Sequence, residues 1–125
     1  MPLFLILFAL PVDTTVLTVD LTTVPIISPF EIKKEAWIDA LHLCENKYDV
    51  PKILDTNGYY SYGKYMWQMR SWLRYTALGT TRENIMDEGM QDKITRHVLD
   101  MGGWKNWYNC GKMLNKTMGM YGESM

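Results

Sequence analysis

The chain has 125 residues, a formal net charge of −1 at pH 7, and an aromatic content made up of eight Tyr, five Trp and three Phe. This length is enough for one domain with a single core. A protein that binds phosphate chains normally carries a basic patch, so the near-neutral charge argues against nucleic acid as a partner. The two His and two Cys show no metal-ligand spacing, and we expect neither a metal nor a cofactor.

Residues 1–29 differ from the rest of the sequence. An unbroken apolar run from Leu3 to Leu10 precedes Pro11 and is too short to span a bilayer, so we expect no stable membrane span. The run resembles the apolar part of a secretory signal, although no Lys or Arg precedes it and no small-residue cleavage site follows. Residues 1–29 are therefore either a signal-like segment or an extended N-terminal arm.

The first regular element is predicted to be a helix from Ser28 to about Asn46. Ser28-Pro29-Phe30-Glu31 is a capping box with Pro at the first helical position. The apolar stripe of this helix consists of Trp37, Ile38, Leu41 and Cys44.

A β-hairpin is expected next, because Asn57-Gly58 favours a two-residue turn between Ile53-Leu54 and Tyr59-Tyr60. Apolar periodicity then predicts three further helices, and Gly residues follow the first two of them. The sequence thus predicts an α+β, mainly α domain over residues 30–114 and a flexible tail over residues 115–125. The three helices are predicted at residues 65–78, about 90–101 and 104–114.

One acidic residue lies on the apolar side of the first helix. Glu45 follows Leu41 by four residues and Ile38 by seven, which places it on the apolar stripe at the C-terminal end. Burial and the negative end of the helix dipole both disfavour the charged form, so we expect a raised pKa for Glu45. A carboxyl group that keeps its proton near neutral pH can act as the general acid in glycosidic cleavage. The alternative is that Glu45 reaches solvent or pairs with Lys47 or Lys52.

Three short motifs follow one another along the chain: Cys44-Glu45-Asn46, Ser61-Tyr62-Gly63-Lys64-Tyr65-Met66 and Trp107-Tyr108-Asn109-Cys110-Gly111. In order, spacing and the intervening hairpin, this set resembles the soluble lytic transglycosylase and goose-type lysozyme superfamily. That family has a catalytic Glu usually followed by Ser, then Ser-x-Gly-Leu-x-Gln, then Ala-Tyr-Asn-x-Gly. The resemblance covers about residues 32–114 and implies a lysozyme-like helical domain with a short β-hairpin.

The resemblance implies an enzyme that cleaves peptidoglycan glycan strands, with Glu45 as its catalytic residue. Glu45 would protonate the leaving glycosidic oxygen and then act as base on the attacking hydroxyl. Tyr108 would orient Glu45, and Asn109 would brace the cleft. Ser61 would position the sugar or hydrogen-bond Glu45, and Gly63 would let the backbone approach the substrate closely. Substrate contacts are thus predicted at Ser61, Tyr62, Gly63, Tyr108 and Asn109.

Four positions depart from the pattern of the family. Asn46 stands where the family usually has Ser, Lys64 where it has Leu, Met66 where it has Gln, and Trp107 where it has Ala. The Met66 departure removes an amide that would hydrogen-bond the substrate. An inactive relative that binds peptidoglycan without cutting it is therefore an alternative, and a helical interaction domain with accidental motif agreement is a third.

The resemblance also indicates a role for the two cysteines. Cys44 precedes the proposed acid, and Cys110 lies in the segment expected to pack against it. We expect a disulfide between them, with two buried thiols in a cytosolic protein as the alternative. Peptidoglycan lies outside the cytosol, which favours the bridge and a secreted or cell-envelope location. We expect a monomer.

The reaction type depends on whether a second carboxylate is present. A hydrolase of this kind generally needs one, and the candidates are Asp49 and Asp55. Asp55, however, precedes the Asn57-Gly58 turn, where an Asx residue is favoured for local hydrogen bonding. With Glu45 alone, a lytic transglycosylase is favoured, in which the sugar's own 6-hydroxyl attacks the anomeric carbon between MurNAc and GlcNAc. Lysozyme-type hydrolysis on the same scaffold is the alternative.

Overall fold

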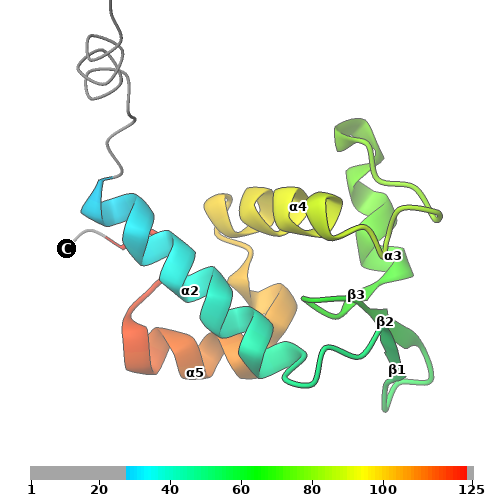
Figure 1. Cartoon of the computed structure of the whole chain (residues 1–125), viewed down its shortest axis with the longest axis horizontal. Coiled ribbons are helices and arrows are strands. Elements are labelled where there is room, and N and C mark those ends of the chain that lie inside the picture. The colour runs from blue at the N-terminus through cyan, green and yellow to red at the C-terminus, as the bar shows by residue number, and fades with distance from the viewer. Residues whose placement is uncertain (1–27, 124–125) are drawn as a thin grey trace, which may run out of the picture.

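The structure, a computed structural model, describes residues 28–123, so most of the predicted N-terminal arm lies outside it. Helices α2 and α5 lie side by side, α4 lies above them in the view of Figure 1, and the sheet lies at one end of the molecule. This arrangement confirms a mainly α, α+β fold. The elements are α2 (Pro29–Glu45), β1 (Lys52–Leu54), β2 (Tyr60–Tyr62), β3 (Trp67–Gln68), α3 (Met69–Trp72), the 3-10 helix η1 (Leu73–Leu78), α4 (Glu88–Asp100), the 3-10 helix η2 (Trp104–Trp107) and α5 (Tyr108–Met118).

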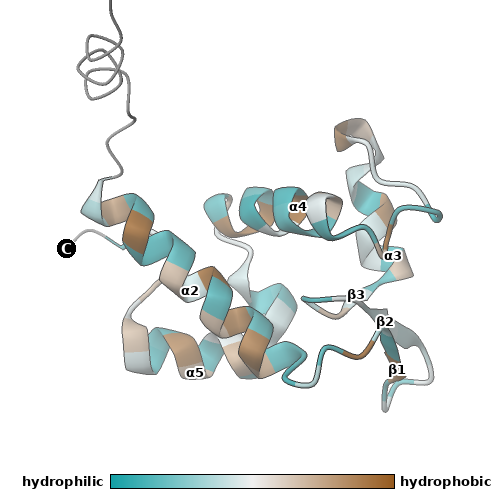
Figure 2. Cartoon of the chain, viewed as in Figure 1, coloured by the Kyte–Doolittle hydropathy of each residue, from teal (hydrophilic) through white to brown (hydrophobic). Residues whose placement is uncertain are grey.

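Helix α2 begins where the capping box predicted it would. The Ser28 hydroxyl accepts a hydrogen bond from the Glu31 amide at 3.1 Å, which satisfies one of the free donors of the first turn. The apolar stripe is buried at Trp37, Ile38 and Leu41. Hydrophobic residues (brown) recur along α2 and α5 where the two helices lie next to each other (Figure 2). The last residue of α2 is Glu45.

The predicted hairpin is present, but its loop is longer than two residues. Strands β1 and β2 pair antiparallel, with Leu54 opposite Tyr60. The Asp55 amide donates to the Tyr59 carbonyl oxygen, and the Gly58 amide donates to the Asp55 carbonyl oxygen. Gly58 has a φ of +87°. The loop is therefore a turn followed by a left-handed glycine, the arrangement typical of three-residue hairpin loops.

The helix predicted over residues 65–78 is wrong at its beginning. Met66 has a φ of +53°, a left-handed conformation that stops a helix from passing through it. Trp67 and Gln68 then form β3, which pairs antiparallel with β2. The Trp67 indole is buried, and its N–H donates to the Thr95 hydroxyl of α4 at 2.9 Å. These tertiary contacts override the helical spacing, and the regular helix begins only at Met69.

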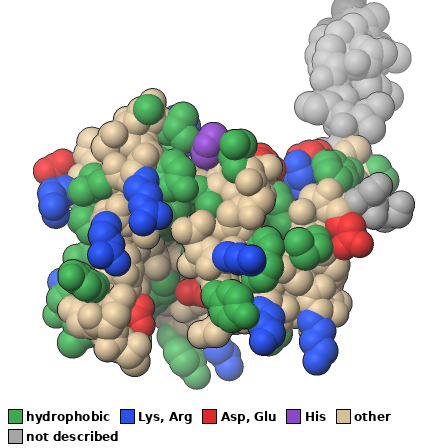
Figure 3. Space-filling view, turned by 180° about the vertical axis from the view of Figure 1, so that it is seen from behind, with side chains coloured by type: hydrophobic (Ala, Val, Ile, Leu, Met, Phe, Trp, Pro, Cys, Tyr) green, Lys and Arg blue, Asp and Glu red, His purple; other side chains and the backbone are tan. Residues whose placement is uncertain are grey.

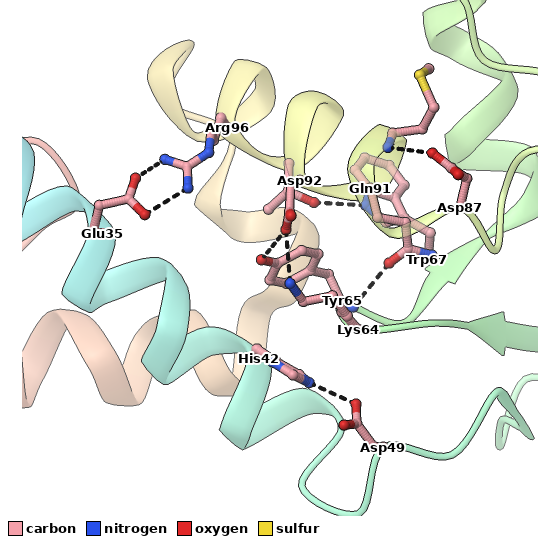
Figure 4. A network of polar contacts seen from close by, with 12 residues as sticks. Glu35, His42, Asp49, Lys64, Tyr65, Trp67, Asp87, Gln91, Asp92 and Arg96 are labelled. Carbon is pink, nitrogen blue, oxygen red and sulfur yellow. Dashed lines mark hydrogen bonds and ion pairs between the residues drawn. The ribbon is translucent and has the colours of Figure 1, made fainter.

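The core is rich in tryptophan. The Trp67 ring meets the rings of Trp72 and Trp107 edge to face, with centroids 5.4 and 5.3 Å apart, a favoured geometry for aromatic pairs. Polar contacts join α2, the turn before β3 and α4 around this core (Figure 4). Arg96 of α4 pairs with Glu35 of α2. The Tyr65 hydroxyl and the Lys64 ammonium group both donate to Asp92 of α4, at 2.7 and 3.1 Å.

The predicted tail is ordered as far as the structure describes it. Helix α5 continues to Met118, so the predicted helix end at residue 114 and the flexible tail over residues 115–125 are corrected up to Glu123. The Trp37 indole N–H donates to the Gly119 carbonyl oxygen at 3.1 Å. The Tyr121 ring packs edge to face on Trp37, with centroids 5.7 Å apart. A buried Trp needs both an acceptor and apolar cover, and the tail supplies them.

Between residues 28 and 123, none of the helices combines the length and the apolar character needed to cross a membrane.

Candidate active site

A polar cavity of about 350 Å³ lies between two walls that are far apart in the sequence. One wall consists of the end of α2 and the start of α5, and we call it the helix wall. The other consists of the β1–β2 hairpin and β3, and we call it the sheet wall. In the view of Figure 3 the surface is hollowed between two parts of the molecule, and acidic side chains (red) lie on both sides of the hollow. The cavity is lined by Glu45, Asp55, Ser61, Met66, Trp67, Gln68, Ser71, Asn106, Trp107, Tyr108 and Asn109.

Glu45 lies on the helix wall with its side chain half-buried and facing the cavity. No residue between 28 and 123 forms a hydrogen bond or an ion pair with its carboxyl group. Lys47 and Lys52 contact the rings of Tyr48 and Tyr60 instead. Burial, and secondly the negative charge of Asp55, raise the pKa of Glu45 to about 7. The predicted direction of the shift is confirmed, and the alternative of a lysine pair is wrong.

Asn46 fixes the chain directly after Glu45. Its buried side-chain amide donates to the carbonyl oxygens of Val50 and Gly63, at 2.7 and 2.9 Å, and its amide oxygen accepts from the Val50 N–H at 2.9 Å. Because Gly63 directly follows β2, this side chain joins the end of α2 to the sheet. The Ser expected at this position is shorter and could not make all three bonds.

The predicted disulfide between Cys44 and Cys110 is confirmed, with the two Cα atoms 5.9 Å apart. It joins the last turn of α2 to the first turn of α5. The bond therefore sets Glu45 near Tyr108 and Asn109, and both of these residues line the cavity. Among the described residues Tyr108 forms no hydrogen bond with Glu45, and its ring stacks on that of Trp104.

Asp55 lies on the sheet wall and faces the same cavity as Glu45. The Ser61 hydroxyl donates to Asp55 Oδ2 at 2.7 Å, and the Gln68 amide donates to the same oxygen at 3.4 Å. The Thr56 backbone amide donates to Asp55 Oδ1 at 3.1 Å, which is the local turn role that the sequence indicated. Asp55 therefore has the turn role and also lines the cavity. Ser61 is in the cavity as predicted, but its partner is Asp55 and not Glu45.

Gln68 is a cavity residue that the sequence reasoning missed. Its amide hydrogen-bonds Asp55, Asn57 and Ser61, so the cavity has the amide that seemed lost at Met66. Met66 lines the cavity too, and its left-handed backbone turns the chain so that Gln68, two residues later, reaches the sheet wall. The sequence does show a glutamine close to the Ser-x-Gly motif. It was overlooked because this position was assigned to the predicted helix.

Gly63 and Tyr62 do not line the Glu45 cavity. Gly63 has a φ of +73°, and a Cβ atom on it would lie 2.3 Å from Nε2 of the buried Gln91 side chain. The turn and this close approach to α4 require glycine here. Tyr62, next to Ser61 in β2, points to the opposite face of the sheet, as strand alternation demands.

The remaining departures from the family pattern have structural reasons. Lys64 pairs with Asp92 of α4 and does not line the cavity. Trp107 is buried, and its indole N–H donates to the Tyr65 carbonyl oxygen at 2.7 Å. Both side chains connect the turn before β3 to the helices around it.

No protein-family model matches the chain, and comparisons with curated proteins and with solved structures found no match. We therefore base the functional proposal on the residues of the cavity.

Proposed function

We propose that the protein cleaves the β-1,4 bond between MurNAc and GlcNAc in peptidoglycan, as a lytic transglycosylase with Glu45 as its single acid and base. The observation that carries the proposal is a half-buried carboxyl group that faces a polar cavity, has no partner in the described part of the chain and has a pKa of about 7. Ser61, Tyr108 and Asn109, drawn from the other two motifs of the resemblance, line the same cavity.

The proposed reaction has two proton transfers, and both use Glu45. The protonated carboxyl group donates its proton to the glycosidic oxygen while the bond from that oxygen to the anomeric carbon of MurNAc breaks. The resulting carboxylate then takes the proton of the 6-hydroxyl of the same MurNAc as this oxygen attacks the anomeric carbon. The products are a 1,6-anhydro end and a free 4-hydroxyl on GlcNAc, and Glu45 has its proton again. A pKa near 7 suits a group that must both donate and accept.

Hydrolysis is the second candidate reaction, and the position of Asp55 favours it. A retaining or inverting glycosidase uses two carboxylates that flank the scissile bond. Asp55 faces Glu45 from the other wall, and three donors hold its carboxylate in place. Asp55 could therefore stabilise positive charge at the anomeric carbon or activate a water molecule there. The product would be a reducing end.

The disulfide supports a proposed location in the cell envelope or outside the cell. Disulfides persist in oxidising compartments and are rare in the cytosol, and the Cys44–Cys110 bond connects two elements of the helix wall. A peptidoglycan-cleaving enzyme meets its substrate in such a compartment.

The experiment that tests the function is mass spectrometry of the products released from purified peptidoglycan by the full chain. We expect anhydro ends from the wild type. Loss of the general acid in Glu45→Gln should lower the rate by about two to four orders of magnitude. If the enzyme is a transglycosylase, the Asp55→Asn protein should still cleave the substrate. If the wild type instead produces reducing ends and Asp55→Asn is inactive, the enzyme is a hydrolase.

A pull-down with insoluble peptidoglycan separates the enzyme from a binding module on the same scaffold. If the wild type releases no products and yet sediments with peptidoglycan as well as Glu45→Gln does, the protein is a non-catalytic glycan-binding domain. Circular dichroism of both proteins controls for folding. The catalytic proposal also fails if Glu45→Gln cleaves as fast as the wild type.

A further inference from the structure

A second cavity, of about 520 Å³, lies on the opposite face of the sheet, to which Tyr62 points. Gln68 lines both cavities, so the second one borders the Glu45 site at the sheet wall. Its lining comes from the hairpin, β3, α3, the start of η1 and the loop after η1, and it includes the apolar side chains of Met69 and Leu73. The aromatic and charged side chains that line it are Tyr59, Tyr60, Tyr62, Arg70 and Arg82.

The two arginines distinguish this cavity. Within residues 28–123, Lys34, Lys64 and Arg96 have carboxylate partners, whereas neither Arg70 nor Arg82 forms an ion pair. Both arginine side chains are exposed. Two unpaired guanidinium groups at one cavity form a positive site in a chain with a net charge of −1.

The tyrosines shape the site around these charges. The Arg70 guanidinium lies over the Tyr59 ring, 5.7 Å from its centroid, a cation–π contact that orients the group. The Tyr60 and Tyr62 rings have centroids 6.3 Å apart. Seen from behind, Lys and Arg side chains (blue) lie with hydrophobic ones (green) between them over the part of the molecule that carries the sheet (Figure 3). Aromatic faces with guanidinium groups suit an extended peptide that carries carboxylates.

We infer that this cavity binds the acidic peptide attached to the MurNAc residue that is held near Glu45. The inference rests on the proposed function, because it takes the glycan strand to lie in the first cavity. A glycan strand stripped of its peptides has one carboxylate on each MurNAc, that of the lactyl group, and this group is held close to the sugar ring in the first cavity. The peptide branches from the strand next to the cleaved bond and carries free carboxylates. A guanidinium group binds a carboxylate through two parallel hydrogen bonds, and Lys in its place would not do so.

The experiment compares two substrates, one that carries the peptide and one in which the free lactyl carboxylate of MurNAc takes its place. One is peptidoglycan with its stem peptides, and the other is the same material after an amidase has removed them. We expect the double variant Arg70→Gln/Arg82→Gln to lower kcat/KM on the first substrate by about tenfold and to leave cleavage of the second unchanged. Arg74→Gln is the matched control, because Arg74 is exposed in η1 and lines neither cavity. Equal loss on both substrates, or no loss on either, overturns the inference.

A binding measurement keeps this test separate from the test of catalysis. The probe is the tetrapeptide L-Ala-γ-D-Glu-L-Lys-D-Ala with an acetylated amino terminus, titrated into the Glu45→Gln protein by calorimetry or NMR. The comparison is the same peptide amidated at both carboxyl groups, which lacks the carboxylates. We expect binding that requires the carboxylates and is lost in the protein that also carries the two arginine substitutions. Absence of binding refutes the peptide site even if the wild type cleaves, and binding supports it even if the wild type does not. Tighter binding of a short oligonucleotide through the same arginines would also refute it.

Discussion

The two walls of the cavity each present one carboxyl group, and the two groups have opposite surroundings. On the helix wall, Glu45 is half-buried and has no hydrogen-bond partner among residues 28–123. On the sheet wall, Asp55 accepts hydrogen bonds from the Thr56 amide, the Ser61 hydroxyl and the Gln68 amide. A desolvated carboxyl group retains its proton, whereas donors stabilise a carboxylate. The same functional group can therefore act as an acid on one wall and as a negative charge on the other.

The two walls also differ in how they are held in place. The helix wall is joined by a covalent bond between α2 and α5 and is packed on the core. The sheet wall consists of strands of two or three residues, and all three residues of β1 are exposed. We therefore expect the helix wall to fix the position of the acid, and the sheet wall to adjust more easily around a substrate.

Breaking the disulfide should have the largest effect on stability. The bond closes a loop with a sequence separation of 66 residues, and its loss in Cys44→Ala/Cys110→Ala should cost about 4 kcal/mol by the loop-entropy model. Urea unfolding, with and without a reducing agent, measures this difference. Since the sequence has two cysteines, the reducing agent acts on this bond alone, and the double variant should not respond to it. Equal midpoints for the oxidised and reduced wild type would show that packing alone holds the helix wall.

The second prediction concerns the pH dependence of stability, which sharpens the contrast between the two carboxyl groups. The pKa of Glu45 is about 7 in the folded protein against an ordinary value of 4.5, so between these values the folded state holds a proton that the unfolded chain has released. Stability should therefore fall as the pH rises from about 4.5 to 7. The loss should be at most about 3.5 kcal/mol, because each pKa unit corresponds to about 1.4 kcal/mol, and it should be smaller than this because water still reaches part of the group.

The variant Glu45→Gln tests this directly, since its amide cannot titrate. We expect the variant to be more stable than the wild type at pH 8 and similar to it at pH 4, as measured by urea unfolding at both values. If Glu45 is the proposed acid, this stabilisation on its removal is a cost that function imposes on the fold. The same stability difference at pH 4 and pH 8 would refute the raised pKa.

The smallest expected effect is at Ser61, which supports the other carboxylate. Ser61→Ala removes the 2.7 Å hydrogen bond to Asp55 and should reduce the free energy of unfolding by about 1 kcal/mol. Ser71→Ala is the matched control, because Ser71 lines the same cavity and its hydroxyl has no partner among residues 28–123. If hydrolysis is the reaction, Ser61→Ala should lower the rate more than Ser71→Ala. Equal behaviour of the two variants would mean that Asp55 needs no support from Ser61.

The helix wall could be predicted from the sequence because its signals are local. The capping box at Ser28 set the start of α2, and helical spacing placed Glu45 on the apolar side. Cys44 and Cys110 could be paired because the resemblance had already brought their segments together.

The sheet wall could not be predicted in full, because tertiary contacts decide it. Met66 has apolar spacing that suits a helix, yet the backbone is left-handed there and Trp67 is held by Thr95 of α4. Gln68 was therefore predicted to lie in a helix, whereas it lies in a strand and lines the cavity. The turn signal at Asp55 was correct, but it did not reveal that the hairpin faces Glu45.

The hydrogen bond between Trp37 and Gly119 has a practical consequence for joining a fusion partner, a tether or a tag to the protein. It holds the end of the described chain against the first half of α2, so both ends leave the molecule on the side opposite the sheet (Figure 1). Helix α2 has 17 residues and spans about 25 Å, with Glu45 at its far end. A fusion partner, surface tether or affinity tag joined directly at residue 28 or residue 123 would therefore emerge well away from the cavity and leave its entrance clear.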